Sequence, residues 1–286
     1  MKILLVGINY APELTGIGKY SGEMCEWLVA NGCEVRVISA PPYYPDWKLH
    51  AGYSKWSYSS EVIKGVTVLR SPLWVPARPT GLKRILHLAT FAISSLPITV
   101  FQLFWRPNVV ISIEPPFFCT PAALLCAKLS RANSWLHIQD FEIDAAFELG
   151  LLQHRWLRRL GNGIESWLMR RFDKVSTISD KMVERVQHEK GVAEDRTALF
   201  MNWVDTDAIF PISGPNELCK QLRIPSGKVI ALYSGNMGEK QGLEVVLQAA
   251  ELMHAENEIL FVLCGDGAAR ARLQNQCQQL TNVIWL

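Results

Sequence analysis

The sequence has few of the features that mark disulfide-rich, zinc-binding or secreted proteins. Its seven cysteines include no CxxC pair, and no group of histidines and cysteines has the spacing of zinc ligands. We therefore expect reduced thiols in a cytoplasmic protein. The apolar start "MKILLVG" is too short for a signal-peptide core and no small-residue cleavage pattern follows it, so it predicts a first buried strand.

Two common nucleotide-binding motifs are also missing. A dinucleotide site needs GxGxxG soon after the first strand and an acidic residue at the end of the second. Here the spacing is Gly16-x-Gly18-x-x-x-Gly22, and the second expected strand ends "VISAPP". A Walker A loop fails as well, because Gly18-Lys19 is followed by tyrosine and no glycine stands at the required offset. These absences disfavour NAD-dependent epimerases and P-loop ATPases.

Short apolar runs alternate with helix-length segments along most of the chain. The expected strands are 2–8, 34–40, 66–71, 108–114, 134–140, 174–179 and 197–202, and the expected helices are 18–31, 82–104, 120–130, 155–171 and 180–189. Alternation of this kind, with nearly continuous apolar strands, is typical of a parallel sheet covered on both faces. The sequence therefore predicts an α/β fold.

A turn-rich stretch with several prolines separates this part of the chain from a second, shorter alternation. We predict a first domain over 1–205, a linker over 206–227 and part of a second domain over 228–286. The expected elements of the second part are strands 228–235, 258–265 and 282–286 and helices 242–254 and 267–280. This is about half of a doubly wound domain, so we expect a chain truncated at its C-terminus.

Two segments bear on membrane binding. Residues 85–105 are apolar and long enough to span a bilayer, but their polar residues favour a buried or interfacial helix. Residues 151–172 interleave arginines with Trp156 and Trp167, a pattern that suits an anionic membrane surface or equally a sheet-covering helix with a solvated charged face. Nucleic acid is less favoured as a partner, because no recognised binding module accompanies the arginines.

Candidate site residues gather at loops that follow expected strands. Gly16 and Gly18 precede a helix, where backbone N–H groups can approach an anion, although tight packing of the loop is an alternative. In "WLHIQDFEIDAAFELG", His137 and Asp140 lie at or just beyond a strand end and are the candidate acid or base groups, whereas Glu142 and Asp144 are expected to cap a helix. The Asp205-x-Asp207 pattern predicts a turn, and no metal is assigned to it.

Five motifs, in order, resemble one enzyme family. They are "PELTGIGKYS", "HIQDFEIDAAFELGLL", "NWVDTDAIFP", "YSGNMGEKQGLEVVLQAAELM" and "LCGDGAARARLQ". Together they resemble the retaining glycosyltransferases of the GT-B fold, family 4, over the whole length present, and within that family the bacterial exopolysaccharide and O-antigen branch. The resemblance implies an N-terminal Rossmann-like parallel-sheet domain followed by the first half of a second Rossmann-like domain.

The resemblance also implies a reaction and its partners. The donor is a nucleotide-diphosphate sugar, with GDP-fucose as the first candidate, and the acceptor is a lipid-linked saccharide at the inner membrane, to which the protein binds peripherally. Gly16, Gly18, Gly235 and Lys240 would bind the donor, and His137 or Asp140 would lie by the reacting sugar and acceptor hydroxyl. The family mechanism retains the anomeric configuration and uses no cofactor or bound metal.

The chain departs from the family pattern at three places. Thr15 replaces a common glycine, and Asn236 and Gln241 replace a common phosphate-binding arginine and lysine, which leaves Lys240 as the nearby positive charge. The family's Glu-x7-Glu segment, which grips the donor sugar and the nucleotide ribose, is expected beyond residue 286. We therefore expect weak transfer by this polypeptide alone, and the alternative function is a non-catalytic module that binds a sugar nucleotide or a membrane.

Overall fold

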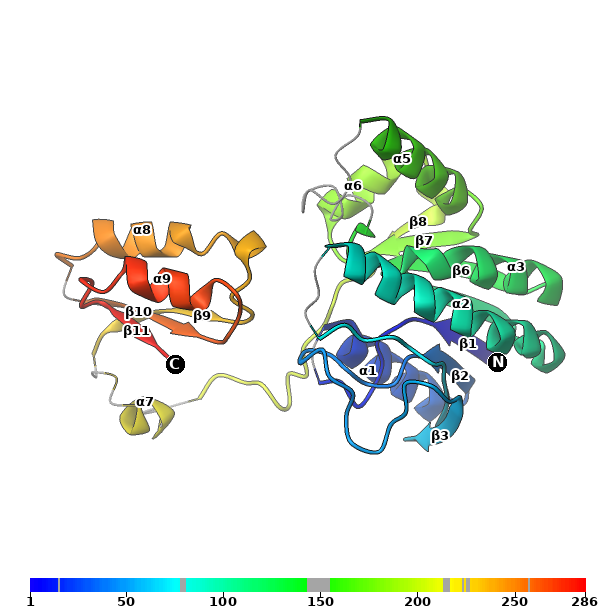
Figure 1. Ribbon diagram of the computed structural model, residues 1–286, viewed down its shortest axis with the longest axis horizontal. Helices are drawn as coiled ribbons and strands as arrows, with labels where there is room; N and C mark the ends of the chain where they lie inside the picture. The colour runs from blue at the N-terminus through cyan, green and yellow to red at the C-terminus, as the bar shows by residue number, and fades with distance from the viewer. Residues whose placement is uncertain are drawn as a thin grey trace. The chain divides into compact units, whose positions relative to one another are not determined.

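The computed structural model describes residues 1–14, 16–77, 81–142, 155–212, 217–222, 224, 227–256 and 258–286. The chain divides into two compact units, Met1–Val204 and Asp205–Leu286. Each unit has its own sheet (Figure 1). The linker over 206–227 and the domain bounds beside it stay a prediction.

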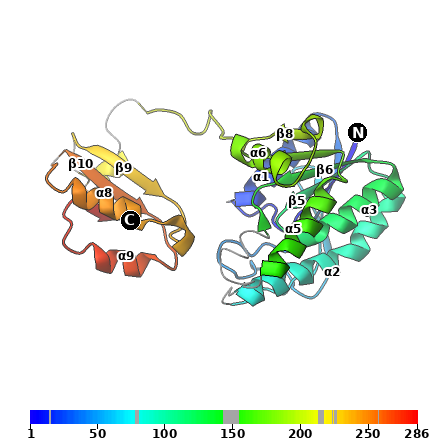
Figure 2. The same cartoon turned by 90° about the horizontal axis from the view of Figure 1, so that it is seen from above.

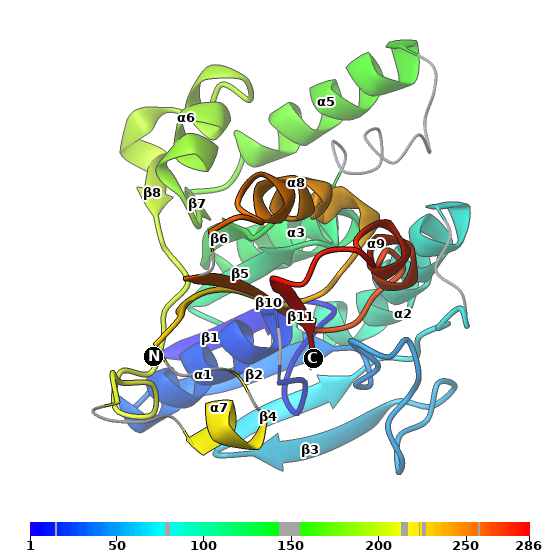
Figure 3. The same cartoon turned by 90° about the vertical axis from the view of Figure 1, so that its left-hand side faces the viewer.

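An eight-stranded sheet forms the centre of the first unit. Its strands are β1 (Lys2–Val6), β2 (Glu34–Ser39), β3 (Ser59–Ile63), β4 (Val66–Arg70), β5 (Val109–Glu114), β6 (Asn133–Ile138), β7 (Lys174–Thr177) and β8 (Thr197–Leu199). Figure 3 shows their order, β3-β4-β2-β1-β5-β6-β7-β8. All neighbours pair parallel except β3 and β4, which pair antiparallel. The predicted α/β fold is confirmed, and β3 is an edge strand that the sequence pattern does not predict.

Helices cover both faces of this sheet. They are α1 (Gly16–Ala30), α2 (Gly81–Trp105), α3 (Thr120–Ser130), α5 (Arg155–Met169) and α6 (Asp180–His188), with short 3-10 turns η1 (Phe117–Cys119) and η2 (Glu194–Arg196). Successive strand residues point to opposite faces. Ile3 and Leu5 of β1 accordingly pack in the cluster that contains Cys25 of α1, whereas Leu4 and Val6 pack with α2 and α3.

Helices α2, α3 and α5 form the layer on the face of the sheet opposite α1. Ala123 of α3 packs with residues of α2, and the adjacent Leu124 belongs to the same buried cluster as Leu168 and Met169 of α5. Figure 2 shows α2 and α3 beside one another. The three helices therefore cover the same face of the sheet with their buried sides.

Helix α2 contains the apolar segment that is long enough to cross a bilayer, but only 28% of its most apolar window is buried. The buried residues recur every three or four positions: His87, Phe91, Ser95, Thr99, Gln102 and Trp105. This spacing puts them on one side of the helix, where they face the sheet. The buried side agrees with the prediction of a buried or interfacial helix, and the outer side is apolar too.

The second unit has a smaller sheet, with all its described strands parallel. They are β9 (Val229–Ser234), β10 (Ile259–Cys264) and β11 (Val283–Trp285), in the order β11-β10-β9. The helices of this unit are α7 (Glu217–Gln221), α8 (Glu244–Leu252) and α9 (Arg270–Gln276), and η3 (Glu239–Gln241) is a 3-10 turn. Leu247 of α8 and Leu273 of α9 pack on Phe261 and Leu263 of β10. The strand–helix alternation predicted for this part of the chain is confirmed.

Candidate functional site

The loop between β1 and α1 places two of the predicted glycines in different surroundings. Gly16 begins α1 with φ +59°, and the nearest atom to the position of an added Cβ is 3.9 Å away. A glycine is therefore favoured there by the backbone conformation rather than by crowding. At Gly18, an added Cβ would lie 2.8 Å from Cβ of Glu13, so this glycine makes room for the Glu13 side chain.

Glu13 is a buried carboxylate that holds the glycine loop to the segment after β2. Its Oε1 accepts hydrogen bonds from the backbone N–H groups of Tyr43 (2.9 Å) and Tyr44 (3.0 Å), and its Oε2 accepts one from Asn9 (2.9 Å). Burial raises the pKa of Glu13, and these hydrogen bonds oppose the shift. Glu13 lies inside the motif "PELTGIGKYS", but the sequence pattern does not predict its role.

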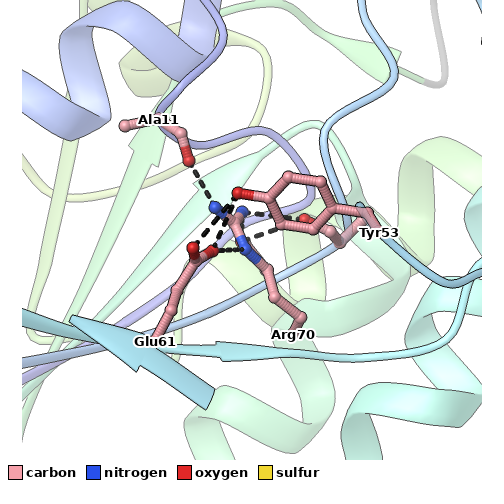
Figure 4. A network of polar contacts seen from close by, with 6 residues as sticks. Ala11, Tyr53, Glu61 and Arg70 are labelled. Carbon is pink, nitrogen blue, oxygen red and sulfur yellow. Dashed lines mark hydrogen bonds and ion pairs between the residues drawn. The ribbon is translucent and has the colours of Figure 1, made fainter. Parts of the chain in front are cut away.

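Arg70, the last residue of β4, joins four segments of the first unit (Figure 4). Its Nε donates to Glu61 of β3 (2.7 Å), its Nη1 donates to Ser39 Oγ (2.7 Å) and to the carbonyl of Ala40 (2.9 Å), and its Nη2 donates to the carbonyl of Ala11 in the glycine loop. The guanidinium is fully buried. A planar fork of donors suits this arrangement, because the acceptors lie in several fixed directions.

Tyr53 encloses the other side of the same network. Its hydroxyl donates to Oε2 of Glu61 (3.1 Å), and its ring lies 5.5 Å from the Arg70 guanidinium carbon. Glu61 is therefore shared by an arginine and a tyrosine, as Figure 4 shows. Ala11, whose carbonyl accepts from Arg70, lies only a few residues before Gly16. The buried network therefore fixes the backbone at the start of the predicted anion-binding loop.

His137, the predicted acid or base at the end of β6, is buried and has both ring nitrogens engaged. Nδ1 lies 2.9 Å from Oγ of Ser176, which also accepts from Nε1 of Trp135, and Nε2 lies 2.9 Å from the amide of Gln139. Burial lowers the pKa of His137 to about 4. A neutral ring with Nδ1–H donating to Ser176 and Nε2 accepting from Gln139 satisfies every one of these contacts.

Gln139 links His137 to the last residues of the first unit by hydrogen bonds. Its side-chain amide and that of Asn202 exchange two hydrogen bonds, each 3.0 Å long. The neighbouring Trp203 donates from Nε1 to Glu23 of α1 (2.6 Å) and packs edge-on against Tyr20. Gln139 and Asn202 lie within the motifs "HIQDFEIDAAFELGLL" and "NWVDTDAIFP", but the sequence pattern does not predict their pairing.

Asp140 follows this amide pair and is exposed at the carboxyl edge of the sheet. Glu142, two residues later, has a carboxylate that accepts from the backbone N–H of Phe117 (2.6 Å) and so ties this loop to the β5–α3 connection. Burial is the main cause that raises the pKa of Glu142 to about 7. Asp144, expected to cap a helix, lies outside the described residues. Asp140 is thus the exposed carboxylate of this loop, among its described residues.

A buried charged cluster lies on the other side of β6. Glu165 of α5 and Lys190 form an ion pair inside the protein, and Lys190 also donates to Asn162 (3.3 Å). Beside them, Glu114 at the end of β5 is fully buried. Burial, followed by the charges of Glu165 and Glu142, raises the pKa of Glu114 well above its ordinary value.

In the second unit, the loops after β9 and β10 pack backbone against backbone. Gly265 has φ +142°, and an added Cβ would lie 1.9 Å from the carbonyl oxygen of Gly235. An added Cβ at Gly267 would likewise lie 2.5 Å from the carbonyl of Met237. Gly235, a predicted donor-binding residue, therefore stands at the carboxyl edge of this sheet with its N–H bonded to Cys264 O (3.0 Å). The side chain of Lys240 lies outside the described part of the structure.

The Asp205-x-Asp207 pattern forms a turn, as predicted. Oδ1 of Asp205 accepts from the backbone N–H groups of Asp207 (2.9 Å) and Ala208 (3.1 Å). These are the contacts of an aspartate that closes a turn on its own backbone. Among the residues that the structure describes, no group of three or more histidine, cysteine, aspartate or glutamate side chains is arranged to hold a metal ion.

Because His137 is held neutral, the stability of the folded protein should depend on pH. The unfolded chain binds a proton near the ordinary pKa of 6.5, whereas the folded protein resists protonation down to about 4. Its contribution is therefore fully present above pH 6.5 and is lost as the pH falls toward 4. Between pH 7 and pH 5, the stability advantage of the wild type over His137→Asn should shrink by about 2 kcal/mol. Urea unfolding of both proteins measures this, and a difference independent of pH would show that His137 is not held neutral.

The sequence matches known families and proteins of one enzyme class. Residues 15–203 match the model of the glycosyl transferase 4-like domain, and residues 216–285 match that of the glycosyl transferases group 1. The chain is 46% identical over 284 residues to WcaI of Escherichia coli strain K12, which carries the name of a colanic acid biosynthesis glycosyl transferase; the match covers 98% of this chain and 69% of WcaI.

Solved structures show the same fold at low sequence identity. The apo form of the lipopolysaccharide outer core galactosyltransferase WaaB aligns with a TM-score of 0.57 at 15% identity, over 100% of this chain and 67% of that one. Anabaena HepE in complex with UDP-glucose aligns with a TM-score of 0.61 at 13% identity, over 100% of this chain and 68% of that one.

Proposed function

This chain belongs to the GT-B glycosyltransferases that carry a glycosyl transferase 4-like domain, and we propose that it transfers a sugar from a nucleotide-diphosphate donor to a lipid-linked saccharide in the biosynthesis of an exopolysaccharide such as colanic acid. The observation that carries the proposal is the 46% identity to WcaI along 98% of this chain. We also propose that it acts in the cytoplasm, peripheral to the inner membrane.

The donor side of the proposal rests on the glycine loops. Gly16 and Gly18 stand where β1 leads into α1, so backbone N–H groups and the start of the helix can face a diphosphate. In the second unit, Gly235 and Lys240 are proposed to bind donor phosphates. The complex of HepE with UDP-glucose supports a nucleotide-sugar donor for this fold. GDP-fucose is the donor that we propose to test first.

We propose different roles for the two predicted acid or base residues, Asp140 and His137. Asp140 is exposed at the carboxyl edge of the sheet, where its carboxylate can meet the acceptor hydroxyl or the reacting sugar. His137 is enclosed by Ser176 and Gln139, so it acts by positioning the loop that carries Asp140. We propose a retaining reaction whose main electrostatic contribution is stabilisation of the leaving diphosphate by these loops.

Metal independence separates this proposal from metal-assisted sugar transfer. We expect transfer from GDP-fucose to continue unchanged in EDTA, because the backbone N–H groups of the glycine loops and the charge of a lysine are proposed to stabilise the leaving diphosphate. The measurement is the initial rate of radiolabelled fucose transfer into lipid, with UDP-glucose as the second donor. A rate that vanishes in EDTA and returns with added divalent cation would overturn the metal-free mechanism.

A further inference from the structure

The outer side of the α2–α3–α5 layer exposes many large apolar side chains. On α2 they are Leu82, Leu86, Ile93, Leu96, Val100, Phe101 and Phe104; on α3, Leu125 and Leu129; and on α5, Trp156, Leu160, Ile164 and Trp167. Ile93 is 73% exposed and Phe104 is 83% exposed. Exposed apolar residues that recur every three or four positions along one side of α2, and likewise along one side of α5, mark an interaction surface rather than the scattered apolar residues of an ordinary surface.

The charge on these helices has one sign. Their basic residues with described side chains are Lys83, Arg84, Lys128, Arg158 and Arg159. Their acidic residues are limited to Glu165, which is fully buried in its pair with Lys190. The opposite face differs, because α1 carries Glu23 and Glu26 beside one lysine. The exposed charge of the three-helix layer is therefore positive throughout its described part.

Apolar and basic groups also meet at close range on this layer. Arg159, Leu160, Gly163, Ile164 and Trp167 of α5 line an open hollow of about 480 Å³. The guanidinium of Arg171, just after α5, lies 3.4 Å from the centre of the Trp167 ring. Tryptophan and arginine side by side suit the boundary between lipid headgroups and acyl chains, where one end of each side chain is apolar and the other polar.

The sign of the charge decides which partner fits this surface. A second copy of the chain packed on the same face would bring basic residues against basic residues, which disfavours a symmetric dimer through it. A bilayer with anionic lipids offers both an apolar layer and negative headgroups. Because the other side of α2 is packed on the sheet, the helix can lie along such a surface without crossing it.

We propose that the outer side of α2, α3 and α5 is a bilayer-docking surface that takes anionic phospholipid. The apolar stripe of α2 enters the boundary of the acyl chains, and Lys128 of α3 with Arg158 and Arg159 of α5 contacts the headgroups. This proposal deepens the proposed function, on which it rests for its purpose: a protein held on this surface meets an acceptor that is itself anchored in the membrane. The sequence pattern points to residues 151–172 as a membrane-binding segment, and the proposed surface adds α2 and α3 to it.

The test is flotation of the protein with vesicles of phosphatidylcholine alone and of phosphatidylcholine mixed with phosphatidylglycerol. We expect binding to the mixed vesicles, weakened by high salt, and little binding to phosphatidylcholine alone. The double variant Ile93→Ser/Phe104→Ser should lower the partition constant roughly tenfold or more, because it removes inserted apolar groups without changing charge. Lys128→Gln/Arg159→Gln should lower it about tenfold on anionic vesicles.

Trp27→Ser is the matched control, because Trp27 is 63% exposed on α1, on the other face of the sheet. Its binding should equal that of the wild type. Equal losses in Trp27→Ser and the α2 variant, no binding of the wild type to mixed vesicles, or a dimer in lipid-free sedimentation that Ile93→Ser/Phe104→Ser converts to monomer would overturn the proposal. Competition by free inorganic phosphate as strong as by vesicles would indicate a soluble anion instead.

Sugar transfer by the same variants separates this proposal from the proposed function. With a water-soluble acceptor analogue, Ile93→Ser/Phe104→Ser should turn over at the wild-type rate, because neither residue lies at the carboxyl edge of the sheet. Vesicle binding without transfer to any acceptor would leave the docking surface standing and contradict the glycosyltransferase function. Transfer without vesicle binding would support the glycosyltransferase function and contradict the docking surface.

Discussion

Replacing Asp140 by asparagine should reduce the rate of sugar transfer by roughly 10²- to 10⁴-fold, the range expected when a positioned acid or base is lost. The change keeps the size and shape of the side chain and removes its charge and its capacity to accept a proton. Asp140 lies two residues beyond β6, where Glu142 and the Gln139–Asn202 pair fix its loop on both sides. The expected loss is therefore in kcat, while the dissociation constant of the donor nucleotide stays close to that of the wild type.

His137→Asn distinguishes a catalytic role from a positioning role in the same segment. Because both nitrogens of His137 are engaged by Ser176 and Gln139, this variant should lose less activity than Asp140→Asn. Steady-state kinetics with saturating donor, together with calorimetric binding of GDP, measures both effects. Full activity of Asp140→Asn alongside inactive His137→Asn would assign the reacting role to the histidine and contradict our account of this site.

Arg70→Lys should destabilise the first unit by roughly 3 kcal/mol or more, the scale of a broken buried ion pair. Lysine keeps the positive charge, but it cannot reach Glu61, Ser39 and the carbonyl of Ala11 together, because those acceptors lie in the separate directions of a planar guanidinium. The unpaired carbonyls left in the interior add to the cost. Urea unfolding of the wild type and the variant measures the difference.

The glycine loop should respond to the same substitution. We expect amide hydrogen exchange over residues 9–22 to accelerate in Arg70→Lys by more than the global loss of stability explains, because the Ala11 carbonyl loses its partner. Arg36→Lys is a suitable control, since Arg36 donates a single bond to Gln102 (3.2 Å) and stacks on Trp105, away from the loop. Uniform acceleration along the whole chain would show that Arg70 stabilises the fold without positioning the loop.

Apolar runs and their spacing predict most of the strands and helices, because those elements are buried on at least one face. The strand β3 is missed for the same reason: its residues "SSEVI" are largely exposed at the sheet edge, so no apolar alternation marks it. The predicted strand 197–202 illustrates the usual uncertainty of boundaries, since β8 ends at Leu199 and residues 200–202 lie outside it.

The candidate site is predictable only in part. The strand-end rule locates His137 and Asp140 on the correct edge, but the sequence cannot show that Ser176 and Gln139 occupy the two ring nitrogens of the histidine. Arg70 and Glu13 escape prediction because their partners come from strands and loops far apart in the chain. The long apolar segment of α2 predicts a helix, yet only the packing shows that it presents an apolar outer side beside two basic helices.

The most direct test of the glycosyltransferase assignment is the release of nucleoside diphosphate that depends on a lipid-linked saccharide acceptor. The assay uses the purified protein, a chain that spans 69% of the length of WcaI. Our account predicts one GDP released for each fucose recovered in the lipid phase, with neither product formed when the acceptor is omitted. Tight binding of GDP-sugars and UDP-sugars with no turnover on any lipid-linked acceptor would contradict it and identify a non-catalytic binding module.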